Sequence, residues 1–160
     1  MPNRQQIYWD SPIWFSYING EADRLPTLDA ILAEAASANG NVEIYTSVLS
    51  QVEVAYAKSE EYGKALDPDI EGQIDQLWAD RDAVKLVEFY DDIGKDARQL
   101  MRSAITRGWK LKPMDAIHLA TTKKRGVTEI HTYDEHLFKY GDVLGIPIRE
   151  PHSMQSRMSI

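Results

Sequence analysis

Four acidic residues are the side chains of this sequence best placed to do chemistry: Asp10, Glu53, Asp115 and Asp134. Asp10 follows the short apolar run at residues 7–9, and Asp134 lies two residues after an expected strand at 129–132, whereas Glu53 and Asp115 fall within expected helices. In an open parallel sheet, ligands bind at the carboxyl ends of the strands and beside the helices that follow them. We therefore expect the four carboxylates to converge at one edge of a sheet.

Each acid also has a simpler interpretation. An aspartate after a strand, such as Asp10 or Asp134, is most often a helix cap or a turn residue. Asp115 can complement the positive end of its helix dipole. Glu53 fits a solvated helix face less well, because Val52 and Val54 on either side of it are apolar. The prediction of a site rests on the set of four and not on any one of them.

Converging carboxylates need a cation or a proton. Two carboxylates about 5 Å apart repel by roughly 3 kcal/mol at an effective dielectric constant near 20. Ligands that are all oxygens select a hard metal, and Mg²⁺ or Mn²⁺ fits a site made of a few carboxylates plus substrate phosphates. Such a site supports hydrolysis of phosphodiester bonds, because a bound metal ion activates water and stabilises the leaving oxygen.

The elements that position these acids alternate along the chain. Apolar runs predict strands at residues 7–9, 42–45, 84–89, 129–132 and 146–148. Apolar residues at helical spacing, with caps, predict helices from Ser11 onward and over 27–38, 46–63, 67–82, 93–108, 114–125 and 135–140. Ser11 is expected to cap the first helix, with Pro12 at its first helical position. Pro113 is expected to open the helix that carries Asp115.

Strands separated by helices imply parallel pairing, with helices on both faces of the sheet. The predicted fold is α/β, with three layers and a Rossmann-like, central, mainly parallel sheet of four or five strands. The 160 residues fit one domain, which we place at residues 5–150. Residues 151–160 read as a polar C-terminal tail.

Composition excludes several classes of protein. The chain has 18 Lys plus Arg against 25 Asp plus Glu, a formal charge of −7, which argues against a general nucleic-acid-coating protein. The absence of cysteine excludes disulfides, iron–sulfur clusters and thiol nucleophiles. The longest uncharged stretch, residues 11–20, is too short to span a bilayer, and the N-terminus lacks the apolar region of a signal peptide. We therefore expect a cytoplasmic protein without a membrane segment.

Four segments together resemble those of PIN domains: Asp10-Ser11, residues 46–54, residues 115–120 (Asp-Ala-Ile-His-Leu-Ala) and residues 132–138, which open with Thr-Tyr-Asp. They occur in the order and spacing of that family. The chain looks like a PIN-domain ribonuclease and is most similar to the VapC-type toxins of bacterial toxin–antitoxin pairs. The likeness runs from about Ile7 to Ile148.

The resemblance implies roles for particular residues. It implies that Asp10, Glu53, Asp115 and Asp134 surround one or two Mg²⁺ or Mn²⁺ ions. It also implies that Ser11, Thr132 and His118 lie just behind these carboxylates. We interpret His118, three residues after Asp115, as a hydrogen-bonded structural histidine and not as a catalytic base. His131 and His136 have no spacing that would make them a metal site with each other.

Basic residues cluster within the otherwise acidic chain. We hypothesise that Arg98 and Arg102, together with Lys110 and Lys112, line a track for RNA phosphates beside the acids. A solvated helix face is the simpler interpretation of such a run.

The partners follow from the same resemblance: an RNA substrate, a separately encoded antitoxin and a second copy of the chain in a homodimer. Two alternatives stay open, an RNA-processing nuclease without an antitoxin and a catalytically inactive binding module. A phosphotransferase with an aspartate nucleophile is weaker, because no second aspartate follows Asp10 two positions later.

Overall fold

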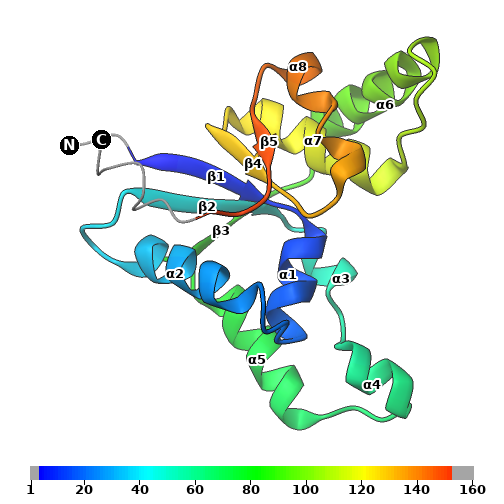
Figure 1. Ribbon diagram of the computed structural model, residues 1–160. Helices are drawn as coiled ribbons and strands as arrows, with labels where there is room; N and C mark the ends of the chain where they lie inside the picture. The colour runs from blue at the N-terminus through cyan, green and yellow to red at the C-terminus, as the bar shows by residue number, and fades with distance from the viewer. Residues whose placement is uncertain (1–3, 153–160) are drawn as a thin grey trace.

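Five parallel strands form a single sheet in the computed structural model of the chain, which describes residues 4–152 (Figure 1). The strands are β1 (Gln5–Trp9), β2 (Val42–Ser47), β3 (Val84–Val87), β4 (Glu129–His131) and β5 (Ile148–Arg149). Their order across the sheet is β3-β2-β1-β4-β5, and every neighbouring pair is parallel. The prediction of a mainly parallel sheet of four or five strands is confirmed, with five strands that are all parallel.

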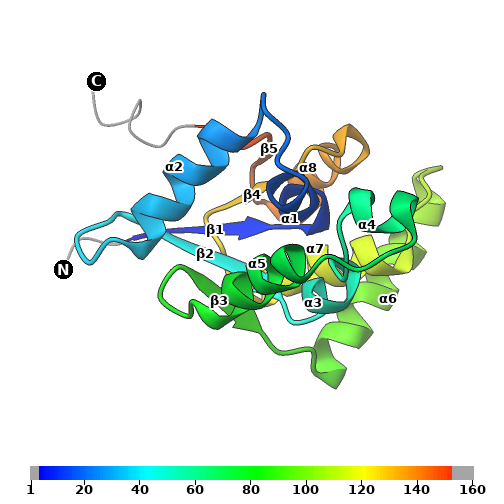
Figure 2. The same ribbon diagram turned by 90° about the horizontal axis from the view of Figure 1, so that it is seen from below.

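Helices cover both faces of this sheet. They are α1 (Ser11–Ile18), α2 (Leu25–Ala36), α3 (Ser50–Glu53), α4 (Lys58–Gly63), α5 (Pro68–Ala79), α6 (Asp91–Thr106), α7 (Pro113–Arg125), the 3₁₀ helix η1 (Glu135–Leu137) and α8 (Tyr140–Leu144). Helices α1, α2 and α5 lie on one face and α6, α7 and α8 on the other (Figures 1 and 2). This three-layer arrangement is the predicted one.

The central strand β1 is buried from both sides. Ile7 and Trp9 belong to the apolar cluster under α1, α2 and α5, whereas Tyr8 belongs to the cluster under α6, α7 and α8. All three side chains are 0% exposed. A strand buried on both faces has no polar alternation, which explains why residues 7–9 of β1 are an uninterrupted apolar run.

The register of the strands brings the predicted site residues to one edge. Trp9, the last residue of β1, lies opposite His131, the last residue of β4. Asp10 follows the first of these strands, and Thr132 follows the second. The chain leaves both strands side by side, so the residues after them are neighbours.

The helix expected over residues 46–63 is wrong as a single element. The structure has two short helices there, α3 and α4, because the backbone at Val54 leaves helical geometry (φ −103°, ψ 60°) and buries that side chain completely. Val52, an apolar residue within the expected helix, is 75% exposed. Burying Val54 against α1 and α5 outweighs the helical pattern around it.

Two other local predictions need correction. Ser11 is not the helix cap, because Asp10 occupies that position and Ser11 is the first residue of α1. The short helix expected over 135–140 is the 3₁₀ helix η1 and is followed by α8. By contrast, α7 begins at Pro113 as predicted, and Gly126 ends it in the left-handed conformation (φ +74°) that glycine adopts without strain.

Across the part of the chain that the structure describes, none of the helices has the length and apolar character needed to cross a bilayer. Most of the predicted tail, residues 153–160, lies outside the described residues. Its first two residues, Pro151 and His152, are half-buried.

Candidate metal centre at the carboxyl edge of the sheet

The side chain of Thr132 joins the ends of β1 and β4. Its hydroxyl donates a hydrogen bond to Oδ2 of Asp10 (2.6 Å) and accepts one from the backbone N–H of Asp134 (3.0 Å). Thr132 is fully buried, and Asp10 is 3% exposed. The predicted position of Thr132 behind the carboxylates matches this geometry.

Asp10 is a buried carboxylate with too few partners. Its Oδ1 atom is buried and has no hydrogen-bond partner among the described residues. Burial raises the pKa of Asp10 to about 7, the charges of Asp115 and Asp134 add to the rise, and the hydrogen bond from Thr132 and the charge of His118 oppose it. A carboxylate in this state needs a proton or a cation next to it.

His118 connects Glu53 to the core of the protein. Its Nε2 atom lies 2.5 Å from Oε1 of Glu53 and 3.1 Å from the hydroxyl of Ser11, and its Nδ1 lies 2.6 Å from the hydroxyl of Tyr8. The Tyr8 oxygen also accepts the backbone N–H of Ser47, and the Nε2–H of His118 donates to Glu53. The interpretation of His118 as a hydrogen-bonded structural residue agrees with this arrangement.

Glu53 lies at the end of the short helix α3, not two turns into a long one, yet it still faces the site. Burial alone would raise the pKa of Glu53, but the hydrogen bond and charge of His118 and the contact with Ser11 outweigh burial and lower it. Glu53 is therefore an ionised carboxylate held at a fixed position and not a side chain on a solvated face.

Asp115 and Asp134 complete the acidic set. Asp115 lies in the first turn of α7, where burial raises its pKa, the charges of Asp134 and Glu53 raise it further, and His118 and Lys112 oppose the rise. Asp134 also has the simpler role weighed for it, because it caps η1 by accepting the backbone N–H of His136 (3.0 Å). Its charge nevertheless reaches Asp10 and Asp115.

The four acids thus form one electrostatic unit suited to a hard cation. Within residues 4–152 they do not form a set of three ligand atoms that all lie within 4.8 Å of one another. Mg²⁺ and Mn²⁺ keep several water molecules and use few direct protein ligands, so they do not require such a set. The unpartnered Oδ1 of buried Asp10 supplies a ligand atom that the protein itself does not satisfy. The residues present therefore fit the predicted ion.

Of the four cations predicted to contact RNA, Lys112 is tied most directly to the acids. It is the residue just before α7, and its charge opposes the raised pKa of Asp115. Lys110 is two residues away in the same exposed loop. Arg98 and Arg102 are exposed on α6, and the described contacts do not connect them to the acids. The structure leaves the proposed track along α6 without a contact that supports it.

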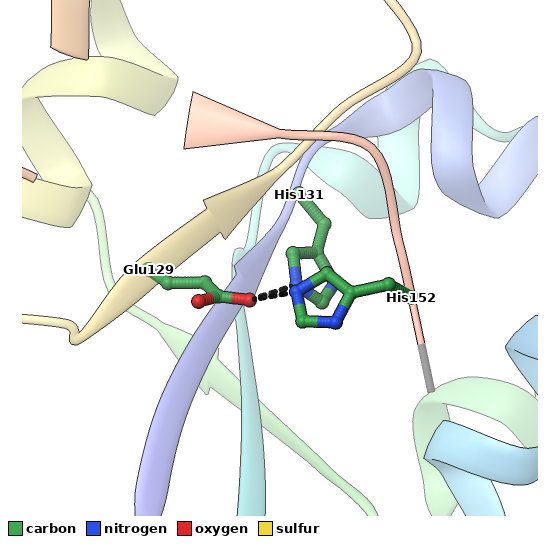
Figure 3. Close-up of side chains that lie close together, drawn as sticks. All are labelled: Glu129, His131 and His152. Carbon is green, nitrogen blue, oxygen red and sulfur yellow. Dashed lines mark hydrogen bonds and ion pairs between the residues drawn. The ribbon is translucent and has the colours of Figure 1, made fainter. Parts of the chain in front are cut away.

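A second cluster, absent from the sequence prediction, lies on β4 and the segment after β5. Figure 3 shows Glu129, His131 and His152 facing one another. Oε1 of Glu129 lies 2.6 Å from Nε2 of His131 and 2.8 Å from Nε2 of His152. Arg149 lies 3.5 Å from the other carboxylate oxygen. Burial would raise the pKa of Glu129, but these three partners lower it to about 2.

This cluster has three ligand atoms within 4.8 Å of one another, so its proton positions decide whether it is a metal site. The indole N–H of Trp9 donates to Nδ1 of His131 (3.2 Å), which leaves the ring proton on Nε2, where it donates to Glu129. A metal ion on Nε2 would move that proton to Nδ1, directly against the buried indole N–H. We interpret the cluster as a hydrogen-bonded clasp of Glu129, His131, His152 and Arg149.

The sequence of residues 7–143 matches the family described as the PIN domain. No curated protein matches the chain significantly. Among solved structures, the chain is similar to VapBC2 from Rickettsia felis bound to a promoter DNA fragment, at a TM-score of 0.66 and 12% identity, with 91% of this chain and 98% of that chain covered.

It is also similar to VapC20 of Mycobacterium tuberculosis, described as a toxin that cleaves the sarcin–ricin loop, at a TM-score of 0.58 and 15% identity over 81% of this chain and 90% of that chain. A third similar structure is FitAcB from Neisseria gonorrhoeae, at a TM-score of 0.60 and 14% identity over 91% and 97% of the two chains. Identities this low establish a shared fold and leave the activity to be argued from the site.

Proposed function

The chain belongs to the PIN-domain family, and from this premise we propose that it is an endoribonuclease that depends on a divalent metal and serves as the toxin of a toxin–antitoxin pair. PIN domains are typically nucleases, and the structural neighbours include VapC toxins in complexes of VapBC type. The expected RNA substrate, antitoxin and homodimer belong to this proposal.

One observation carries the proposal. Asp10 is buried, its Oδ1 has no partner among the described residues, and two further acids raise its pKa. A purely structural carboxylate at this position would cost stability, because an unpaired buried charge is unfavourable. A bound cation would neutralise this buried charge. This argues against an inactive binding module, which would have no such cation.

The roles of the chain's own residues follow from their contacts. Asp10, Glu53, Asp115 and Asp134 would hold Mg²⁺ or Mn²⁺, and a bound ion supplies activation of water and neutralisation of charge on a phosphodiester. Thr132 fixes one oxygen of Asp10, and the other has no hydrogen-bond partner among the described residues. His118 fixes Glu53, and Ser11 and Tyr8 fix His118. Asp10 and Glu53 are thus held in place before substrate arrives.

The role as a toxin rests on the neighbours and not on a contact in this chain. The VapBC and FitA–FitB proteins among them were solved as assemblies. We propose a comparable partner for this chain, which blocks the acidic edge by placing a basic side chain among the carboxylates. A nuclease without an antitoxin would cleave RNA by the same metal-dependent chemistry but would have no protein partner that blocks the acidic edge.

Cleavage of RNA by the purified protein tests the proposal. We expect a mixture of ribosomal and transfer RNA to be cut when Mg²⁺ or Mn²⁺ is added and to stay intact when EDTA is present. Restoring the metal in excess over EDTA should restore cleavage. Cutting that persists in EDTA, or intact RNA under every metal condition, would contradict a metal-dependent ribonuclease.

A further inference from the structure

A cationic aromatic surface lies on the loop between α6 and α7. The indole of Trp109 has the guanidinium of Arg107 at 5.3 Å and the ammonium of Lys139 at 4.8 Å from its ring centroid. The ring packs edge-on against Tyr140, with centroids 5.1 Å apart and planes at 72°. We call Arg107, Trp109, Lys139 and Tyr140 the Trp109 platform.

The backbone at the end of α6 fixes the position of this platform. Helix α6 ends at Thr106, and Gly108 adopts a left-handed conformation (φ +71°) that turns the chain back. The N–H of Trp109 then donates to the carbonyl of Ala104 (2.9 Å), which closes the helix end. Leu111 is buried in the core and anchors the far side of the loop. The half-buried indole is therefore held at a fixed position.

The cations of this region have no acidic partners. Within the described residues, Arg107, Lys110, Lys112 and Lys139 form no ion pair, although Lys95 and Lys124 elsewhere do. All four are exposed. In a chain with a formal charge of −7, acidic partners are abundant. Two unpaired cations over one aromatic ring, with two more in the loop that carries it, therefore mark a surface that attracts an anion.

The platform adjoins the acidic site. Lys112 ends the loop that carries Trp109 and is the residue before α7, whose first turn carries Asp115. From the other side, Tyr140 packs under Trp109, and its hydroxyl is buried without a hydrogen-bond partner among the described residues. Burial raises the pKa of Tyr140, and the charge of Asp115 adds to the rise. The surface and the carboxylates therefore lie within electrostatic reach of each other.

We propose that the Trp109 platform binds the single-stranded RNA segment next to the bond that is cut, an inference that rests on the proposed ribonuclease function. A base takes the place of the cations over the indole, and Arg107 and Lys139 turn to the phosphates on either side of it. Proteins that bind single strands combine an aromatic face for the bases with cations for the backbone, and the platform has both. The platform shares its loop with Lys110 and Lys112 of the hypothesised phosphate track, whereas Arg98 and Arg102 of that track lie on α6.

Fluorescence titration in EDTA tests the platform without cleavage. Of the four tryptophans, Trp9, Trp14 and Trp78 are buried, so Trp109 is the one that an added strand can reach. We expect a short single-stranded RNA to quench the fluorescence of the wild type, and the quenching to disappear in Trp109→Phe. The double variant Arg107→Ala/Lys139→Ala should bind about tenfold more weakly. The slope of the logarithm of its binding constant against the logarithm of the salt concentration should become shallower by about 0.7 for each lost phosphate contact.

Lys95→Ala is the matched control, because it removes a charge from an exposed lysine that is already paired with Asp91. Equal affinity of the double variant and this control would overturn the platform, as would unchanged tryptophan fluorescence at saturating RNA. Quenching by polyglutamate as strong as that by RNA would also overturn it and indicate a surface for acidic protein.

The same variants separate the two proposals. Binding through the platform without any metal-dependent cleavage supports the platform and contradicts the proposed function. Cleavage at the wild-type kcat/KM in the double variant contradicts the platform and leaves the proposed function standing.

Discussion

Replacing Asp10 or Asp115 with asparagine is expected to lower the rate of RNA cleavage by about 100-fold or more. Each substitution keeps the shape of the side chain and removes one negative charge from the set that would hold the cation. Asp10 is the stronger test. In asparagine, the place of its unpartnered Oδ1 would be taken by an amide NH₂ group or by an uncharged carbonyl oxygen. The initial rate of cleavage of a labelled RNA in Mn²⁺ measures the effect.

Asp75→Asn is the matched control, since it makes the same chemical change at an exposed position on α5. It should cleave RNA at the wild-type rate. Circular dichroism of the three variants should show that each stays folded. Full activity in Asp10→Asn or Asp115→Asn would show that cleavage takes place somewhere else.

Replacing Glu129 with glutamine is expected to lower the free energy of unfolding by about 3 kcal/mol at pH 7. Glu129 is 2% exposed and accepts hydrogen bonds from His131 and His152 through one oxygen. With its oxygen at the place of Oε1, glutamine keeps the acceptor for both histidines, but it lacks the negative charge and turns its amide nitrogen, a donor, toward Arg149. Urea denaturation measures the difference.

The difference in the free energy of unfolding between the wild type and Glu129→Gln should become smaller as the pH falls. The pKa of Glu129 is lowered from 4.5 to about 2 in the folded protein, so the folded state holds this carboxylate ionised when the unfolded state is already protonated. Its contribution is complete above pH 4.5 and is lost as the pH falls toward 2. The gap between wild type and Glu129→Gln should therefore narrow below pH 4.5.

Glu88→Gln changes an exposed glutamate just after β3 and should alter stability by no more than about 0.5 kcal/mol. A Glu129→Gln variant as stable as this control would mean that the clasp of Glu129, His131, His152 and Arg149 contributes nothing. If the difference in the free energy of unfolding between wild type and Glu129→Gln stays constant from pH 7 to pH 3, the charge of the Glu129 carboxylate is not the source of that difference.

The parts of the site that the sequence predicts are those set by local patterns. Apolar runs identify the strands that end at Asp10 and before Asp134, and parallel pairing then brings these ends together. Pro113 and Gly126 delimit α7, which fixes Asp115 and His118 on one helix. Local sequence is sufficient here because each signal acts within a few residues.

The parts that the sequence does not predict depend on distant contacts. The helical pattern over 46–63 gives no sign that Val54 packs into the core and ends α3, so Glu53 reaches the site from an unexpected element. The clasp joins Glu129 to His152, which are 23 residues apart, through the pairing of β4 and β5. Trp109 has no sequence pattern of its own, because the cations beside it come from two different segments.

Direct binding of Mn²⁺, followed by calorimetry or electron paramagnetic resonance, tests most directly whether the acidic edge is a metal centre. The wild type and His152→Ala should bind Mn²⁺ equally, because His152 belongs to the clasp and not to the four acids. Asp115→Asn should bind about tenfold or more weakly. Equal binding by wild type and Asp115→Asn, or binding lost in His152→Ala, would contradict a cation held by Asp10, Glu53, Asp115 and Asp134.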